Sequence, residues 1–352
     1  MSFNPSRLAI ARKRRMLTKK AFAEAIGVTQ HTVTRWDKGS TDAPSAENLR
    51  LISQVLGFPE KFFFGKDVDT PERASFRSQT SMSASARDAA LAAGSVAYLI
   101  ADWFDARFSF PKVSVPDLSD YPEPEEAARV LREAWGLGER PISNIVHLLE
   151  SKGVRVFSLA ENTTKVDAYS LWRNNRPHVF LNSLKTAERS RFDAAHELGH
   201  LVLHQDGHEE GREAEDQANK FASAFLMPRG DVLAHCSTGH TLADLIHLKV
   251  RWRVSVAALA YRLHKLKLLS DWKYRDICIE LNSHYKRSEP NPIDREISAV
   301  WDKAMKVMWS EKITPSKISA DIGIPEAELR DLLFSMAMPK RDGTSQLGVK
   351  LA

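Results

Sequence analysis

The chain has 352 residues, of which 43% are hydrophobic and 27% charged, and its formal net charge is +5. This composition is typical of a soluble globular protein, and the length predicts two or three domains at ~100–200 residues each. The two cysteines, Cys236 and Cys278, lie far apart and exclude a disulfide framework, so we expect a reducing, cytoplasmic location.

Two further classes of segment are excluded by the distribution of apolar residues. The basic N-terminus is not followed by a long apolar stretch, which excludes a signal peptide. The most apolar run, residues 89–101, is shorter than the ~20 residues that a membrane span needs. We therefore expect this run to form a buried helix and the chain to have no membrane partner.

The N-terminal region predicts a compact helical unit with clear helix boundaries. Thr18 and Thr29 are suitable N-caps, and Gly27 and Gly39 are suitable ends for the helices that follow them. The three helices predicted first span Pro5–Arg15, Lys19–Ile26 and Gln30–Lys38. The short turn from Gly27 to Thr29 has the length of the turn in a helix-turn-helix.

The third of these helices carries residue types that read DNA. Apolar residues predict the small core, namely Ala21, Ala25, Ile26, Val28, Val33 and Trp36. This arrangement leaves an outward polar set, which consists of Gln30, His31, Thr34, Arg35 and Lys38. Glutamine can pair with adenine, threonine can contact bases, and arginine or lysine can reach guanine or phosphate.

The first twenty residues contain seven basic residues and no acidic one, namely Arg7, Arg12, Lys13, Arg14, Arg15, Lys19 and Lys20. A polyanion such as DNA is the natural partner of such a segment, although a solvated basic helix face is an equal alternative.

These N-terminal residues resemble the XRE (Cro/repressor-like) family. The resemblance covers about 60 residues and rests on Thr18–Ala23, Gly27–Gln30 and Val33–Gly39. It implies binding to double-stranded DNA, and two half-sites imply a homodimer. A helical bundle that binds protein is the alternative.

The middle of the chain predicts a small sheet between helices. Residues 68–87 have the Ser-rich and Arg-rich composition of a linker. Helices are predicted at 86–107, 125–135 and 142–151, strands at 154–157, 166–172 and 179–181, and mostly helix from Thr186 onward. The predicted fold class is therefore mainly α with a small three-stranded sheet, an α+β protein.

A metal-site motif lies in the first of the later helices. His196 and His200 are four residues apart, so they share one helix face and can reach one metal ion. Glu197 lies beside them and can act as a general base that accepts a proton from water. An ordinary helix with surface histidines is the alternative.

A third protein ligand must come from elsewhere in the chain. His204 lies ~12 Å along the helix from His196, so we expect it at the rim or beside a ligand rather than on the same metal. The acidic stretch from Glu209 to Asp216 offers Glu215, which opens a helix with Ala218 and Ala222 on its face. Glu213 and Asp216 are fallback ligands, and a solvated acidic loop remains an alternative.

This second region resembles the ImmA/IrrE family of zinc-dependent endopeptidases. The resemblance rests on His196–His200, on Glu215, Ala218, Asn219, Phe221 and Ala222, on Leu226–Pro228, on Ser255–Leu263 and on Phe76–Ser78. It implies zinc bound by His196, His200 and Glu215, Glu197 as the catalytic base, and a gluzincin-like fold. It also implies a protein substrate, because family members cleave repressors and so switch on genes.

The resulting domain prediction has four parts. Residues 1–67 form a five-helix-type helix-turn-helix domain, 68–120 a linker and helix, 121–285 the metallopeptidase domain, and 286–352 a small helical C-terminal module. Within the last part, residues 318–333 have a helix-turn-helix pattern but expose Glu326, Glu328 and Asp331, which favours packing or dimerisation over DNA binding. Asp193 is a candidate to orient a ligand histidine, and a surface acid of the helix is an equal alternative.

Together these features predict a DNA-binding transcriptional regulator with zinc endopeptidase activity. Its substrate is expected to be a repressor protein, either a partner or this chain itself cut in the linker between Phe76 and Arg87. The rival hypothesis is a non-enzymatic transcription factor whose zincin-like domain only senses metal or a protein partner. An intact Glu197 argues against the rival, because holding zinc alone needs no general base.

Overall fold

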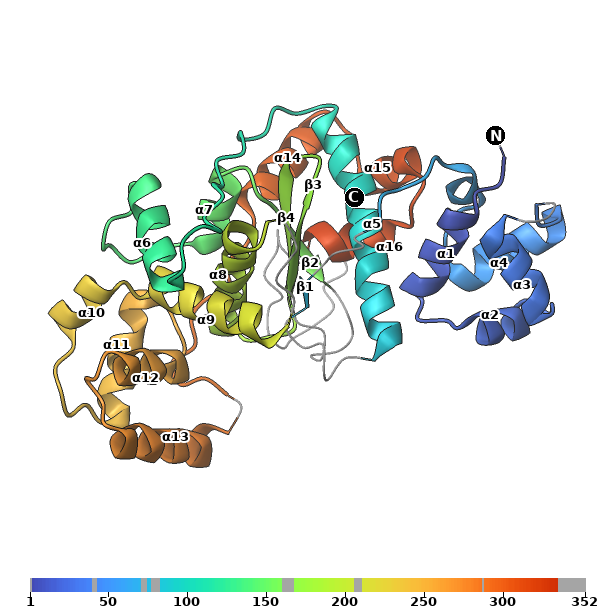
Figure 1. Cartoon of the computed structure of the whole chain (residues 1–352). Coiled ribbons are helices and arrows are strands. Elements are labelled where there is room, and N and C mark those ends of the chain that lie inside the picture. Colours follow the sequence, from blue (N-terminus) through green and yellow to red (C-terminus); the bar gives the residue numbers. More distant parts are fainter. Residues whose placement is uncertain are drawn as a thin grey trace, which may run out of the picture.

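A computed structural model of the chain describes residues 2–39, 43–70, 75–76, 83–159, 168–205, 211–286 and 288–334. Within these residues the fold is mainly α-helical with one small mixed sheet, which confirms the predicted α+β class. Figure 1 shows the N-terminal helices at one end of the molecule, the sheet in the middle and α10–α13 at the other end.

The N-terminal unit has the five helices expected of it. They are α1 (Pro5–Arg14), α2 (Lys19–Ala25), α3 (Gln30–Lys38), α4 (Ala46–Leu56) and the 3₁₀-helix η1 (Glu60–Phe64). The predicted caps are confirmed, since the side chains of Thr18 and Thr29 accept hydrogen bonds from the amides of Ala21 and Thr32. Gly39 ends α3 in the left-handed conformation that favours glycine. One predicted core residue, Ala25, is exposed instead.

The sheet has the strand order β1-β3-β4-β2. Its strands are β1 (Ser75–Phe76), β2 (Arg155–Leu159), β3 (Tyr169–Arg173) and β4 (Arg176–Asn182). The predicted strands correspond to β2, β3 and β4, although residues 166–167 lie outside the described residues. The additional strand β1 comes from the predicted linker and pairs antiparallel with β3, whereas β2 pairs parallel with β4.

The sheet is covered by helices on both faces, because its strands alternate buried side chains between two hydrophobic clusters. Phe157 and Phe180 pack on the side of α5 (Ala84–Asp105), in a cluster that continues into the N-terminal unit. Val156 and Val179 pack on the opposite side, with α8 (Ala187–Leu203). Helix α5 contains the apolar run expected to be buried, and it stands between the N-terminal unit and the sheet (Figure 1).

The remaining helices of the central region surround α8 and extend away from the sheet. They are α6 (Pro124–Ala134), α7 (Ile145–Ser151), α9 (Arg212–Leu226), α10 (Arg229–His235), α11 (Leu242–Trp252), α12 (Val256–Lys265) and α13 (Asp271–Tyr285). Helix α9 packs closely against α8, which brings together the two segments that carry the predicted metal ligands.

The C-terminal helices pack against both earlier parts of the chain. They are α14 (Ala299–Ser310), α15 (Pro315–Ile322), α16 (Glu326–Leu329) and a π-helical turn, η2 (Arg330–Phe334). Trp301 of α14 donates a hydrogen bond to the carbonyl of Val156 in β2 at 2.7 Å. Glu328 of α16 is not an outward residue as expected, because it is 2% exposed and binds Arg14 and Arg15 of the N-terminal unit.

Within the described part of the chain, no helix combines the length and hydrophobicity that a membrane span requires. Cys236 and Cys278 are both free, as the sequence predicts.

Candidate metal centre and nucleic-acid interface

The candidate metal centre forms where α8 and α9 approach each other closely. Gly199 makes this approach possible, because a Cβ atom at that position would lie 3.1 Å from Phe221 Cδ1 and 3.2 Å from Ala218 Cα. Glu215 lies about one turn before Ala218, so the contact places it opposite the histidines that flank Gly199.

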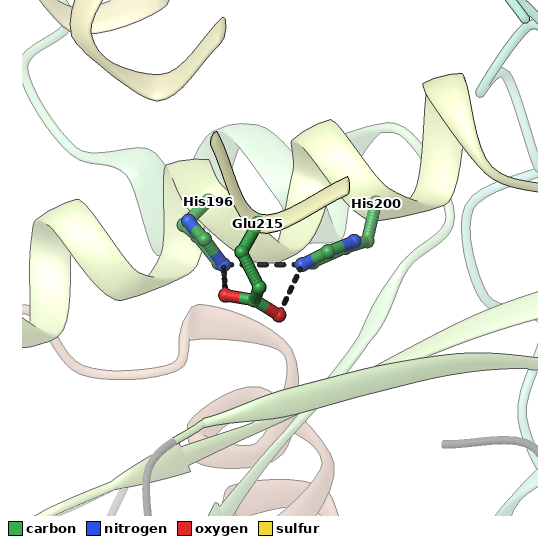
Figure 2. Close-up of side chains that lie close together, drawn as sticks. All are labelled: His196, His200 and Glu215. Atoms are coloured by element: carbon green, nitrogen blue, oxygen red, sulfur yellow. Dashed lines mark hydrogen bonds and ion pairs between the residues drawn. The ribbon is translucent and has the colours of Figure 1, made fainter. Parts of the chain in front are cut away.

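Three side chains converge at this contact. His196 Nε2 lies 3.1 Å from His200 Nε2, and Glu215 places one carboxylate oxygen 3.3 Å from His196 Nε2 and the other 3.4 Å from His200 Nε2. Figure 2 shows both histidines pointing from α8 toward the glutamate. Both imidazoles are buried, whereas the Glu215 side chain is 20% exposed and leaves the centre open to solvent on that side.

These separations fit a zinc ion. Four ligands at ~2.0–2.1 Å in a tetrahedron have their donor atoms about 3.3–3.4 Å apart. Two imidazole nitrogens and one carboxylate are also a donor set used by catalytic zinc, which keeps a fourth position open. Among the described residues, His196, His200 and Glu215 form the group whose ligand atoms all lie within 4.8 Å of one another.

The carboxylate of Glu215 is held in its ionised form. Burial alone raises its pKa, but the hydrogen bonds and charges of His196 and His200 outweigh burial and hold the pKa well below its ordinary value. The two fallback ligands, Glu213 and Asp216, lie at the surface. Glu213 is exposed, and Asp216 pairs with Lys220 at 2.7 Å.

The candidate base Glu197 is fixed by a residue that the sequence did not point to. Ser170 of β3 donates a hydrogen bond to Glu197 Oε2 at 2.7 Å, and its hydroxyl also lies 3.2 Å from the Glu197 carbonyl. Both residues are buried. This serine lies 27 positions before Glu197, so only the pairing of sheet and helix reveals it.

A series of hydrogen-bonded side chains extends from His200 away from the candidate metal centre. His204 Nδ1 lies 3.0 Å from His200 Nδ1, and His204 Nε2 lies 2.8 Å from Gln217 Oε1. Because the amide oxygen accepts, His204 carries its proton on Nε2 and can accept the His200 proton at Nδ1. A metal ion at the centre would displace the proton through which His200 Nε2 bonds Glu215, and the Nε2 lone pair would then face the ion. Of the two positions expected for His204, the structure favours the one beside a candidate ligand, while Gln217 was not predicted.

Asp193 is engaged in ion pairs. It lies 3.0 Å from Lys185 and 3.1 Å from Arg189, and its side chain is 3% exposed. Its expected role beside a ligand histidine stays a prediction.

A hollow in the surface along α9 reaches Glu215, and a second hollow adjoins it. One of about 620 Å³ is lined by Arg212, Glu213, Glu215, Asp216 and Asn219. A second of about 880 Å³ shares Asp216 and Asn219 and extends to Phe192 on α8 and Tyr261 on α12. A polypeptide segment therefore has room beside Glu215.

The predicted DNA-reading residues lie on the solvent side of α3. Gln30, His31, Arg35 and Lys38 are exposed and Thr34 is half-buried, whereas Val33 and Trp36 of the same helix are buried. This face is available to a major groove, but the contacts to DNA stay a prediction.

Most of the basic residues before α3 are buried or form contacts with other parts of the chain. Arg7, Arg12 and Arg14 are buried, and Arg12 pairs with Asp37 at 3.1 Å. Arg14 binds Glu328 at 2.8 Å. These arginines contact acids that lie later in the sequence, and contact of the basic segment with DNA stays a prediction.

Comparison with known protein families gives a match for each of the two regions. Residues 8–63 match a family model described as Helix-turn-helix, and residues 149–264 match a peptidase family model described as IrrE N-terminal-like domain. Both resemblances seen in the sequence are thereby confirmed. A search of curated proteins gave no match.

Proposed function

Because one chain joins a helix-turn-helix domain to an IrrE-like peptidase domain, we propose that it is a DNA-binding regulator with zinc-dependent endopeptidase activity. Its substrate on this proposal is a repressor protein, either a partner or the chain itself. The observation that carries the proposal is the convergence of His196, His200 and Glu215 beside a buried, hydrogen-bonded Glu197.

In the proposed reaction, His196, His200 and Glu215 hold zinc, which supplies a Lewis acid that polarises a peptide carbonyl. Glu197 accepts a proton from the attacking water and returns it to the departing amine. Ser170 keeps the Glu197 carboxylate in position through the hydrogen bond at 2.7 Å. A domain that only sensed metal would need no such placement of a carboxylate.

The DNA-binding part of the proposal rests on α3. Its exposed face carries Gln30, Arg35 and Lys38, which suit base edges and phosphates. Reading two half-sites requires two copies, so we propose a homodimer on DNA.

The decisive experiment compares wild type with Glu197→Gln, each loaded with zinc, alone and with repressors encoded beside it. The substitution keeps size and the three candidate ligands, so zinc content and DNA binding should remain while cleavage is abolished. Intact-mass measurement identifies the fragments. Equal fragment yields from both forms would rule out the mechanism, and no fragments from either form would favour the metal-sensing or partner-sensing alternative.

A further inference from the structure

The larger hollow beside the candidate metal centre has no part in the reaction proposed above. Its volume is about 880 Å³, and it lies between α8, α9, α12 and the segment that follows α13. Phe192, one turn before His196 on α8, and Asn219, one turn after Glu215 on α9, both line it. Asp216 and Asn219 also line the smaller hollow that reaches Glu215. A polypeptide bound at the centre can therefore place a side chain in the larger hollow.

Two acidic side chains that share a single lysine line the larger hollow. Lys249 of α11 is fully buried, and its Nζ atom lies 3.0 Å from Glu188 Oε1 and 3.1 Å from Glu289 Oε1. The same two oxygens accept hydrogen bonds from main-chain amides, that of Ile293 at 2.9 Å and that of Val256 at 2.8 Å. Two carboxylates and one ammonium group leave one negative charge uncompensated within this group of three.

The two glutamates also have unused capacity to accept hydrogen bonds. The Glu188 side chain is buried, and its Oε2 atom has no hydrogen-bond partner among the described residues. The Glu289 side chain is 12% exposed. Burial and the nearby Glu188 charge raise the pKa of Glu289 against the opposing effects of the Val256 amide and Lys249. A buried acceptor without a donor is costly, so this pair of glutamates is suited to bind one more cationic donor.

The basic residues that line the larger hollow are paired elsewhere or lie at the surface. Lys185 lies 3.0 Å and Arg189 3.1 Å from Asp193, and Lys286 is exposed. The wall also has apolar side chains, namely Phe192, Ala257, Ala258, Tyr261 and Leu281. An aliphatic stem can lie along such a wall while its charged end reaches the glutamates.

The position of the glutamates matches the reach of a substrate side chain. Glu188 precedes His196 by eight residues, which is ~12 Å along α8. A long side chain and one or two residues of extended chain, at ~3.3–3.6 Å per residue, cover that distance. We propose that the larger hollow is a specificity pocket for a basic residue of the protein substrate, one or two residues from the scissile bond, with Glu188 and Glu289 as acceptors. This inference rests on the proposed peptidase function.

The test compares two peptides that differ in charge but hardly in shape. The probes are short fluorescein-labelled peptides of alanine and serine with either arginine or citrulline at the centre, because citrulline is a neutral analogue of arginine. The parent protein is the full chain loaded with zinc and carrying Glu197→Gln to prevent cleavage. Fluorescence anisotropy should show that the arginine peptide binds about tenfold more tightly, the effect of a buried hydrogen bond between charged groups.

Glu289→Gln and Glu213→Gln, each added to the parent protein, form a matched pair. Each removes one negative charge, but Glu289 lines the larger hollow and Glu213 only the smaller one. Glu289→Gln leaves one carboxylate for Lys249, so it should bind both peptides with the affinity that the parent has for the citrulline peptide. Glu213→Gln should keep the tenfold preference. If circular dichroism shows that Glu289→Gln is not folded, Ala258→Phe decides, because it fills the hollow without changing its charge and should abolish the preference.

Free arginine, added as a competitor, separates a substrate pocket from a site for a small molecule. It should displace the labelled arginine peptide at least tenfold less effectively than the unlabelled peptide does, because it lacks the rest of the chain. Equal competition, equal binding of the two peptides to the parent, or a preference that changes as much in Glu213→Gln as in Glu289→Gln would overturn the pocket. If the affinities follow the expected order but the zinc-loaded chain with an intact Glu197 cleaves none of the repressors, the pocket stands and the peptidase proposal fails.

Discussion

A Cβ atom placed on Gly199 would lie 3.2 Å from the Cα atom of Ala218, so these two residues mark a close approach of α8 and α9. The approach positions Glu215 opposite His196 and His200, which lie on either side of Gly199. The shape of the candidate metal centre therefore depends on a residue that is not one of the three candidate ligands.

Gly199→Ala should lower both the stability of the chain and the zinc affinity of the candidate metal centre. Alanine favours a helix over glycine by ~1 kcal/mol, but overpacking against Ala218 and Phe221 costs ~1–3 kcal/mol. We expect net stability to fall by about 1 kcal/mol and zinc affinity by about tenfold, because Glu215 moves with α9. Calorimetry measures the stability, and a zinc titration measures the affinity. Ser190→Ala, earlier in α8, is the control, and a similar loss of zinc affinity in it would contradict this reasoning.

Glu215→Ala should release zinc, whereas Glu213→Ala should not. Glu215 lies within 3.4 Å of the Nε2 atoms of both histidines, while Glu213 is exposed on the same helix. Elemental analysis of the purified proteins should show about one zinc per chain in wild type and Glu213→Ala, and close to none in Glu215→Ala. The reverse result would mean that the third ligand is misassigned.

Sequence reasoning succeeded where the signal was local. Helix caps such as Thr29 act within one turn, and His196 and His200 are brought together by helical spacing alone. It failed where a partner lay far along the chain. The bond between Ser170 and Glu197 depends on how β3 packs on α8, and no residue pattern near either one encodes it.

The N-terminal arginines and the linker illustrate the same limit. A run of basic residues predicts a charged surface, yet Arg14 is neutralised by Glu328, which is 314 positions away. The linker composition indicated an exposed segment, but Ser75 and Phe76 pair with β3. Self-cleavage is predicted between Phe76 and Arg87, and residues 77–82 of this segment lie outside the described residues.

Ser170→Ala should lower kcat about tenfold or more while changing KM little. The hydroxyl orients the Glu197 carboxylate, and a buried hydrogen bond to a charged group contributes ~1.5–3 kcal/mol. Steady-state kinetics on a fragmented repressor identified by the decisive experiment measures both constants. Ser158→Ala is a matched control, because Ser158 is also a buried serine of the sheet but its hydroxyl has no hydrogen-bond partner among the described residues. Equal effects in the two variants would indicate a general loss of packing.

Arg35→Ala and Lys38→Ala should each weaken DNA binding and lower the salt slope by about one unit if they contact phosphate. Gln30→Ala should instead relax the preference at one base position, by ~1–3 kcal/mol. Fluorescence anisotropy on duplexes selected from a random pool measures these effects. Lys265→Ala, in α12 of the peptidase region, should bind DNA as wild type does. If wild type shows no affinity for DNA at low salt, the proposed DNA-binding role of α3 is wrong.

Glu328→Ala should destabilise the junction between the N-terminal and C-terminal helices. The carboxylate is buried and binds Arg14 Nε at 2.8 Å and Arg15 Nη1 at 2.6 Å. Removing one partner of a buried ion pair costs ~3–5 kcal/mol, and the partial exposure of Arg15 places the expected loss at the lower end, about 3 kcal/mol.

The matched control for Glu328→Ala is Glu326→Ala on the same short helix. Glu326 pairs with Arg330 one turn away at the surface, and such pairs contribute ~0.3–0.5 kcal/mol. Differential scanning calorimetry should therefore show a clear fall in melting temperature for Glu328→Ala and almost none for Glu326→Ala. The first variant should also expose α1 to limited proteolysis, since its anchor to α16 is lost. Equal melting temperatures in the two variants would mean that the apolar contacts of α1 with α5 hold the N-terminal unit without the ion pair.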